Sequence, residues 1–206
     1  MINPLIFLLF SLPVGAGMEF DAYVKQAELR LAEAVGVTRE VKGGLIHDWS
    51  AERFIANRTP EQVIKLLQDY NRYREIYPEV TESRLISRQG NRFRAALQLK
   101  RHKVLTVILN TEYEVDYEAL EGGGWKVFSR STKVEESEGF DHGFLWRLNS
   151  YWTITSAQGG VKVRCRSISI SRDVPHGLGW MVKPLVRDMP RDSLESMLAA
   201  TAKALE

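Results

Sequence analysis

Apolar and polar residues alternate along most of the chain between Pro78 and Pro175, a pattern typical of strands with one buried face. The clearest run alternates four apolar residues with four polar ones, namely Phe93, Ala95, Leu97 and Leu99 with Arg92, Arg94, Gln98 and Lys100. Glycine-containing turns at residues 89–91, 122–124 and 158–160 separate such runs, and glycine in a short loop is a hairpin signal. The basic residues 101–103 and the segment 136–143 supply two more connections, so the pattern predicts an antiparallel meander of six strands.

One strand and two short helices are predicted before this meander. Residues 45–57 have the bulky side chains of a first strand. Residues 59–62, Thr-Pro-Glu-Gln, form a capping box in which the threonine and glutamine side chains bond each other's backbone amides, so a helix begins here. A second short helix brings Tyr70, Tyr73 and Tyr77 to one face. These tyrosines either pack against the sheet or also border an opening into it.

After Pro175 the apolar residues recur with helical spacing. Proline lacks an amide hydrogen and restricts the residue before it, so a short irregular helix is expected before Pro190 and a straight one after it, with a further interruption at Pro184. Residues 177–181 combine two glycines with Trp180. Such a segment suits a gate over an interior cavity or a patch that touches a membrane surface, and a loop that only packs is the alternative.

The N-terminal residues 1–17 contain no charge and end in small residues. They are typical of a secretory signal peptide, which predicts a periplasmic or secreted protein. If Met18 is the true start, the protein is instead cytoplasmic. Residues 18–44 are expected to form an N-terminal helix and a linker, because apolar residues at helical spacing are followed by glycines.

Together these elements predict an α+β fold: a curved antiparallel seven-stranded sheet wrapped around a long C-terminal helix, with two short helices after the first strand. Residues 56–86 read ANRTPEQVIKLLQDYNRYREIYPEVTESRLI, which is a strand end, a capped helix, aromatic residues near a proline and the next strand. This order, over residues 45–206, resembles the START-like, helix-grip superfamily, which includes polyketide cyclase-like and coenzyme-Q-binding proteins. The resemblance implies a cavity for a lipid, sterol, quinone or polyketide. It transfers no catalytic residue, since the superfamily shares no active-site motif.

Composition and motifs favour binding over catalysis. A formal net charge of +2 does not indicate a nucleic-acid-binding protein. The four histidines are far apart in the sequence, Cys165 is the single cysteine, and no nucleophile elbow or phosphate loop is present. We therefore expect no metal, no cofactor and no intrachain disulfide.

The fifth and sixth strands of the meander place indoles and serines on one face. An unpaired buried hydroxyl costs about 1–3 kcal/mol, so this mixture fits a partly open cavity in which a ligand or water completes the hydrogen bonds. The alternative is that the serines lie at the rim and touch solvent.

The leading hypothesis is non-enzymatic binding or transport of a hydrophobic or amphipathic small molecule. The candidate ligand-binding residues are Tyr73, Tyr77, Leu97, Leu109, Tyr113, Trp146 and Trp152, with Ser167 as a polar anchor and Trp180 and Leu185 at the gate.

Two other hypotheses remain open. A cyclase- or hydrolase-like enzyme would need an ionisable pair facing the cavity, for which Arg130, Arg147, Arg166 and Tyr151 are the candidates. A protein-interaction module would use the basic stretch at residues 84–103. Neither the ligand's identity nor the oligomeric state follows from these patterns.

Overall fold

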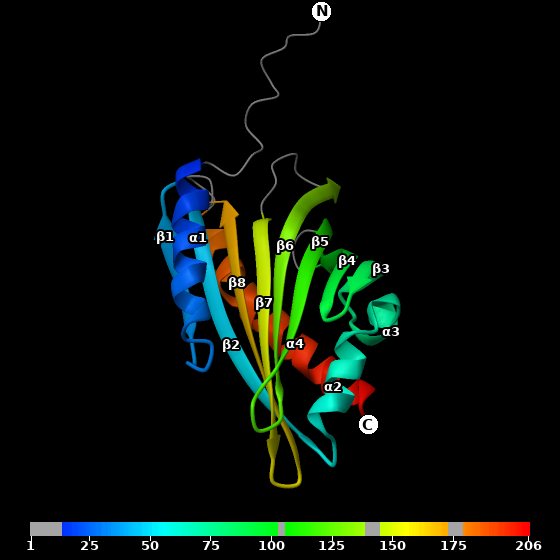
Figure 1. Ribbon diagram of the computed structural model, residues 1–206. Coiled ribbons are helices and arrows are strands. Elements are labelled where there is room, and N and C mark those ends of the chain that lie inside the picture. The colour runs from blue at the N-terminus through cyan, green and yellow to red at the C-terminus, as the bar shows by residue number, and fades with distance from the viewer. Residues whose placement is uncertain (1–13, 103–105, 139–144, 173–178) are drawn as a thin grey trace, which may run out of the picture.

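The computed structural model describes residues 14–102, 106–138, 145–172 and 179–206, and for residues 101–102, 137–138 and 179–189 it describes the backbone alone. Eight antiparallel strands form one sheet in the order β1-β2-β8-β7-β6-β5-β4-β3 (Figure 1). The strands are β1 (Gly36–Val41), β2 (Gly44–Ala56), β3 (Val80–Gln89), β4 (Arg92–His102), β5 (Thr106–Ala119), β6 (Trp125–Glu138), β7 (Leu145–Ala157) and β8 (Gly160–Arg172). The helices are α1 (Val14–Glu28), α2 (Pro60–Leu67), the 3-10 turn η1 (Tyr70–Arg72), α3 (Tyr73–Ile76) and α4 (Gly179–Ala204).

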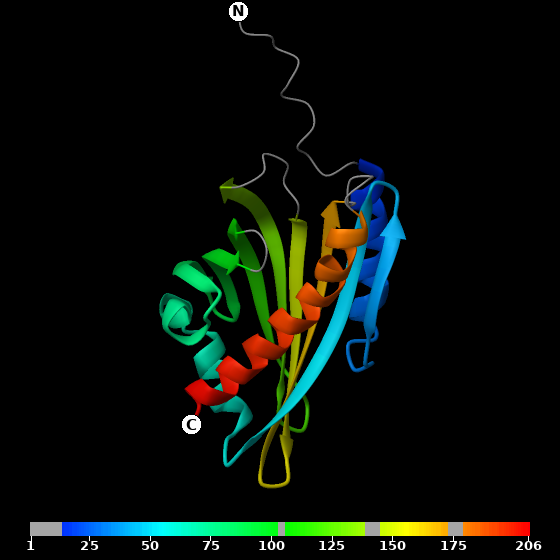
Figure 2. The ribbon, with the colours of Figure 1, turned by 180° about the vertical axis from the view of Figure 1, so that it is seen from behind.

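The sheet curves around α4, which crosses its concave face (Figure 2). Strands β3 to β8 follow one another as the meander, and β2 pairs with the last of them, from Gly44 opposite Arg172 to Ala56 opposite Gly160. The connection from β2 to β3 carries α2, η1 and α3. Helix α1 lies on the opposite, outer face of the sheet, over β2 and β8 (Figure 1). The predicted α+β helix-grip fold is confirmed, and so is the capping box at Thr59, whose hydroxyl accepts from the Gln62 amide.

The first part of β2, residues 44–48, and the last part of β8, residues 165–171, are largely buried on both faces, because α4 covers one face and α1 the other. Towards α4, a core cluster includes Ile55, Val161, Val163, Cys165, Leu194 and Leu198. Towards α1, a second cluster includes Ala16, Phe20, Ile46, Tyr151, Ile168 and Ile170. Simple alternation therefore does not tell which face of these two strands points inward.

The structure adds an eighth strand to the seven that were predicted. Strand β1 lies within the segment expected to be a linker and pairs with β2 through a tight turn in which Gly43 has a φ of 85°. It was missed because it is an edge strand whose residues are exposed or half-buried, so it shows no apolar face. Helix α1 also ends earlier than its apolar spacing indicated, at Glu28, although Leu31 beyond it is still buried.

The C-terminal helix is continuous where interruptions were expected. Helix α4 runs from Gly179 to Ala204 through both Pro184 and Pro190. A proline inside a helix removes its own hydrogen bond but leaves the bonds of the flanking turns in place, so a long helix can contain one. The result is a single helix that runs diagonally across the concave face of the sheet (Figure 2).

Candidate ligand-binding cavity

A cavity of about 290 Å³ lies between the concave face of the sheet, the segment from α2 to β3, and α4. Its aliphatic lining comprises Leu67, Val80, Leu97, Leu99, Val107, Leu109, Val115, Val127, Leu145, Leu148, Leu194 and Met197. Its aromatic lining comprises Tyr70, Tyr73, Tyr77, Tyr113, Tyr117 and Trp152. Hollows of this size with a mainly apolar wall are typical small-molecule sites.

Seven of the ten candidate binding residues line this cavity: Tyr73, Tyr77, Leu97, Leu109, Tyr113, Trp152 and Ser167. They come together because each lies on the inward face of its strand or on the helical segment above it. Their contact with a ligand stays a prediction. The side chains of Trp180 and Leu185, the candidates for a gate, lie outside the described residues.

Trp146 lies on the outer face of the sheet, not in the cavity. It packs with the cluster under α1, and its ring is close to Gly44. The register between β7 and β8 shifts between Leu145 and Arg147. This irregularity turns Leu145 inward and Trp146 outward, whereas uninterrupted alternation from Trp152 back to Leu148 would have placed Trp146 inside.

Tyr70, Tyr73, Tyr77 and Tyr117 present rings to the cavity, and their hydroxyls are already partnered. The hydroxyls of Tyr73 and Tyr117 donate to the carbonyl oxygen of Leu67, at 2.5 and 2.7 Å, and the Tyr70 hydroxyl lies 2.7 Å from that of Tyr117. These bonds satisfy the last carbonyl of α2. Burial raises the pKa of Tyr77 to about 12, so this phenol is neutral. The tyrosines thus pack the helical segment against the sheet and line the hollow as well.

Hydroxyl groups gather on the cavity wall formed by β6, β7 and β8. Ser129 lies opposite Ser150, and Ser150 lies opposite Ser167, so three serines stand side by side on neighbouring strands. Ser169 and Ser171 extend this group along β8. We call these five residues the serine wall. Alternation had placed Ser150, Ser167 and Ser169 on one face of β7 and β8, and of the five only Ser167 was chosen as a polar anchor; the structure shows that this face points inward.

His47 joins the serine wall from β2, and no pattern in the sequence singled it out. Its side chain is 2% exposed. Its Nε2 lies 2.8 Å from the Ser171 hydroxyl and its Nδ1 lies 3.2 Å from the Thr38 hydroxyl. Burial lowers the pKa of His47 to about 4, so the ring is neutral near pH 7. A lone histidine within an apolar strand carries no spacing signal, and the inward face of β2 became clear only from its pairing with β8.

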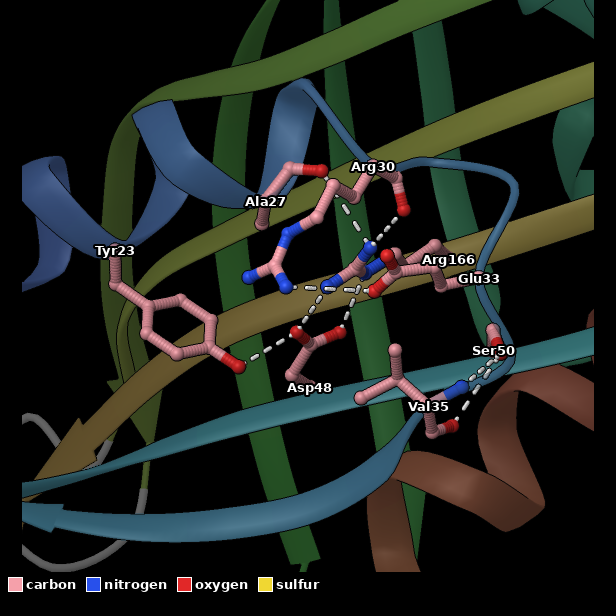
Figure 3. Close-up of polar contacts among 8 residues, drawn as sticks. All are labelled: Tyr23, Ala27, Arg30, Glu33, Val35, Asp48, Ser50 and Arg166. Atoms are coloured by element: carbon pink, nitrogen blue, oxygen red, sulfur yellow. Dashed lines mark hydrogen bonds and ion pairs between the residues drawn. The ribbon is translucent and has the colours of Figure 1, made fainter.

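The four residues considered for catalysis lie on the outer face, and none of them lines the cavity. Arg166 forms a fork with Asp48, with Nε and Nη2 2.8 and 2.6 Å from the two carboxylate oxygens, beneath α1 (Figure 3). Arg130 pairs with Glu28 of α1, at 2.9 Å. Arg147 donates to the carbonyl of Ser131, and the Tyr151 hydroxyl accepts from the side chain of Asn149. The outward-facing alternative therefore holds for all four, and the cyclase- or hydrolase-like hypothesis loses its candidate ionisable pair.

Helix α1 is held to the sheet by the same ion pair. The Tyr23 hydroxyl donates to Asp48 at 2.7 Å, and Arg166 donates to the carbonyl oxygens of Arg30 and Ala27, at 2.7 and 3.4 Å (Figure 3). Burial and the bond to Asp48 raise the pKa of Tyr23 to about 12. These contacts join the N-terminal segment to β2 and β8 without reaching the cavity.

Within the described ranges, no group of three or more histidine, cysteine, aspartate or glutamate residues is placed to hold a metal ion. No helix in the same part of the chain combines the length and apolarity that a membrane crossing requires.

Comparison with solved structures identifies the same architecture in several proteins. A crystal structure of a Thermus thermophilus protein is similar at a TM-score of 0.59 and 19% identity, covering 76% of this chain and 94% of the other. The STAR-related lipid transfer protein of Xanthomonas axonopodis is similar at a TM-score of 0.56 and 17% identity, covering 81% and 99%. Human STARD10 is similar at a TM-score of 0.57 and 14% identity, covering 94% and 82%. At these identities the likeness establishes the fold alone.

The search of curated protein sequences found no match. A family profile does match, over residues 56–200, from the end of β2 into α4. This match includes strands β3 to β8 and most of α4, and the chain belongs to the family described as Polyketide cyclase / dehydrase and lipid transport.

Proposed function

We propose that this protein is a non-enzymatic carrier that encloses a hydrophobic or amphipathic small molecule between the sheet and α4. The observation that carries the proposal is the cavity of about 290 Å³ with its aliphatic and aromatic lining. Burial of about 200 Å² of apolar ligand surface would contribute roughly 5 kcal/mol before the costs of association. The family description, which includes lipid transport, supports the same conclusion. From the uncharged apolar segment at residues 1–17, of which residues 14–17 begin α1, we also propose a location outside the cytoplasm.

The family description also includes cyclases, and one contact favours a hydrolase-like alternative. His47 Nε2 and the Ser171 hydroxyl lie 2.8 Å apart on the cavity wall, which is the distance of a base from a nucleophile. However, the other ring nitrogen faces the hydroxyl of Thr38 and not a carboxylate. With its pKa lowered to about 4, His47 is a weak base for the Ser171 proton near pH 7. We therefore favour binding without chemical conversion.

Filling the cavity should weaken binding without unfolding the protein. Leu109 lines the cavity and is half-buried, so its replacement by tryptophan would occupy ligand space. We expect Leu109→Trp to weaken binding of diphenylhexatriene, a fluorescent hydrocarbon, by about tenfold or more, because overpacking a site costs about 1–3 kcal/mol. The measurement is a fluorescence titration of the full chain, alongside a thermal melt that reports folding.

Leu29 provides the matched control. It follows α1 and is 78% exposed, so Leu29→Trp adds the same side chain outside the cavity and should leave the affinity within about twofold. Native mass spectrometry of protein purified from its own host, followed by lipid extraction, adds a test without a surrogate ligand. A wild-type protein that is empty on extraction and does not bind the hydrocarbon would refute the carrier proposal.

A further inference from the structure

The serine wall has more hydroxyl groups than the described protein groups satisfy. The Ser171 hydroxyl contacts His47 and the carbonyl oxygen of Arg172. No side-chain hydrogen bond joins the hydroxyls of Ser129, Ser150, Ser167 or Ser169 to another residue in the described part of the chain. All four residues line the cavity. Their remaining hydrogen-bonding capacity is therefore directed to whatever fills the hollow.

Ser169 is the least exposed of these four serines. It is 3% exposed and lies opposite His47 on β2 and opposite Leu148 on β7. Among the described residues Trp49 Nε1 is the one buried side-chain nitrogen or oxygen without a partner, so the Ser169 hydroxyl opens into the cavity, where a polar atom of a ligand or a water molecule can bond to it. Three more serines with free hydroxyls beside it make a continuous polar strip on an otherwise apolar interior.

The charge of this strip is close to zero. His47 is the only titratable residue next to the serine wall among the described cavity-lining residues, and burial keeps its ring neutral. The charged lining residues are Glu79, just before β3, and Lys100, near the end of β4. Strands β3 and β4 lie at the far edge of the sheet, with β5 between β4 and the serine wall. Among the described side chains, none beside the serine wall is a cation that would compensate a buried carboxylate or phosphate.

We propose that the serine wall binds the uncharged polar end of an amphipathic ligand, a hydroxyl or carbonyl group, while the ligand's apolar body lies against Leu97, Leu109 and Tyr113. This inference rests on the proposed function and narrows the ligand class to neutral alcohols and carbonyl compounds, as opposed to fatty acids or other lipids with a charged end. Serine hydroxyls both donate and accept, so they match either a hydroxyl or a carbonyl.

Two probes of equal chain length test the charge preference. Dodecanol and dodecanoate at pH 8 differ only in their polar end, and each can be measured by displacement of diphenylhexatriene from the full-length wild-type protein. We expect dodecanol to bind about tenfold more tightly or better, since a buried unpaired carboxylate is penalised far more than a hydroxyl. Equal or tighter binding of dodecanoate would overturn the inference.

Serine-to-alanine variants test whether the polar end of the ligand binds at the serine wall. Ser169→Ala and Ser150→Ala should each weaken dodecanol binding about three- to tenfold, which is the contribution of one neutral hydrogen bond. The affinity of each variant for diphenylhexatriene should stay within about twofold of the wild-type affinity. Ser156→Ala, at an exposed position on β7, is the matched control and should change neither the affinity for dodecanol nor that for diphenylhexatriene. Ser169→Ala should leave the melting temperature of the empty protein unchanged or raised, because the lost hydroxyl has no described partner. A lowered melting temperature would show that this hydroxyl is structural.

The outcomes separate the two proposals. If the hydrocarbon binds but dodecanol gains no advantage and the serine variants have no effect, the carrier proposal stands and the serine wall is not a recognition site. If the wild-type protein binds neither hydrocarbon nor alcohol, both proposals fail.

Discussion

Replacement of Asp48 by asparagine is expected to lower the free energy of unfolding by about 3–5 kcal/mol, the typical cost of breaking a buried ion pair. The side chains of Asp48 and Arg166 are 0% and 4% exposed, and their closest nitrogen and oxygen atoms are 2.6 Å apart. Without the carboxylate, the charge of Arg166 stays buried beneath α1 with uncharged acceptors, the asparagine amide oxygen and the backbone carbonyls of Ala27 and Arg30 (Figure 3). The Tyr23 hydroxyl would lose its charged acceptor as well. Urea denaturation of wild type and variant measures the difference.

The same two strands provide a matched control for this variant. Arg164 of β8 and Glu52 of β2 also form an arginine–carboxylate pair, at 2.7 Å, but their side chains are 26% and 33% exposed. Glu52→Gln should therefore cost no more than about 1 kcal/mol, since exposed ion pairs contribute little. Equal losses for Asp48→Asn and Glu52→Gln would show that burial does not strengthen the role of Asp48.

Acidification from pH 7 to pH 4 is expected to remove about 3 kcal/mol of stability through His47 alone. Its pKa is lowered from 6.5 to about 4 in the folded protein, because the buried ring is desolvated. The unfolded chain therefore binds a proton below pH 6.5 while the folded protein still excludes it. Each pKa unit corresponds to about 1.36 kcal/mol, so this contribution is fully present above pH 6.5 and is lost as the pH falls towards 4.

His47→Asn isolates this contribution, because asparagine can hydrogen-bond to Ser171 and Thr38 but does not titrate in this range. The carboxylates titrate near pH 4 in wild type and variant alike, so the difference between the two stability profiles reports His47. We expect the wild type to lose about 3 kcal/mol more stability than the variant as the pH falls from 6.5 to about 4, measured by urea denaturation at each pH. Parallel profiles would contradict the burial of a neutral ring.

The sequence predicted most of the fold because the fold depends on local signals. The capping box at Thr59 specified where α2 begins, and the glycine turns divided the meander at the positions where the hairpins occur. Much of the cavity wall followed as well, since strands β4 and β5 have one buried face and their alternation correctly turned Leu97, Leu109 and Tyr113 inward. The tyrosines after α2 were found by their helical spacing.

The candidate site was wrong where a strand is covered on both sides. On β7 and β8 the residues facing α1 are as bulky and as buried as those facing α4, so Trp146 and Arg166 could be assigned to either face. The shift between Leu145 and Arg147 reversed the orientation of Trp146, and such an irregularity leaves no mark in the composition of the strand. His47 was missed for the same reason, since its partners Thr38 and Ser171 are brought to it only by strand pairing.

By itself the sequence determined the order of the elements and the fold class, because caps, turns and alternation act between residues that are close along the chain. Only the tertiary structure decided which face of β2, β7 and β8 lines the cavity, how the serines of three strands form one wall, and how α1 covers the arginines. These arrangements depend on strand register and on contacts between residues more than a hundred positions apart, such as the pair of Asp48 and Arg166. Local patterns contain no information about such pairings, because the sequence around Asp48 or Arg166 does not reveal which strand pairs with it.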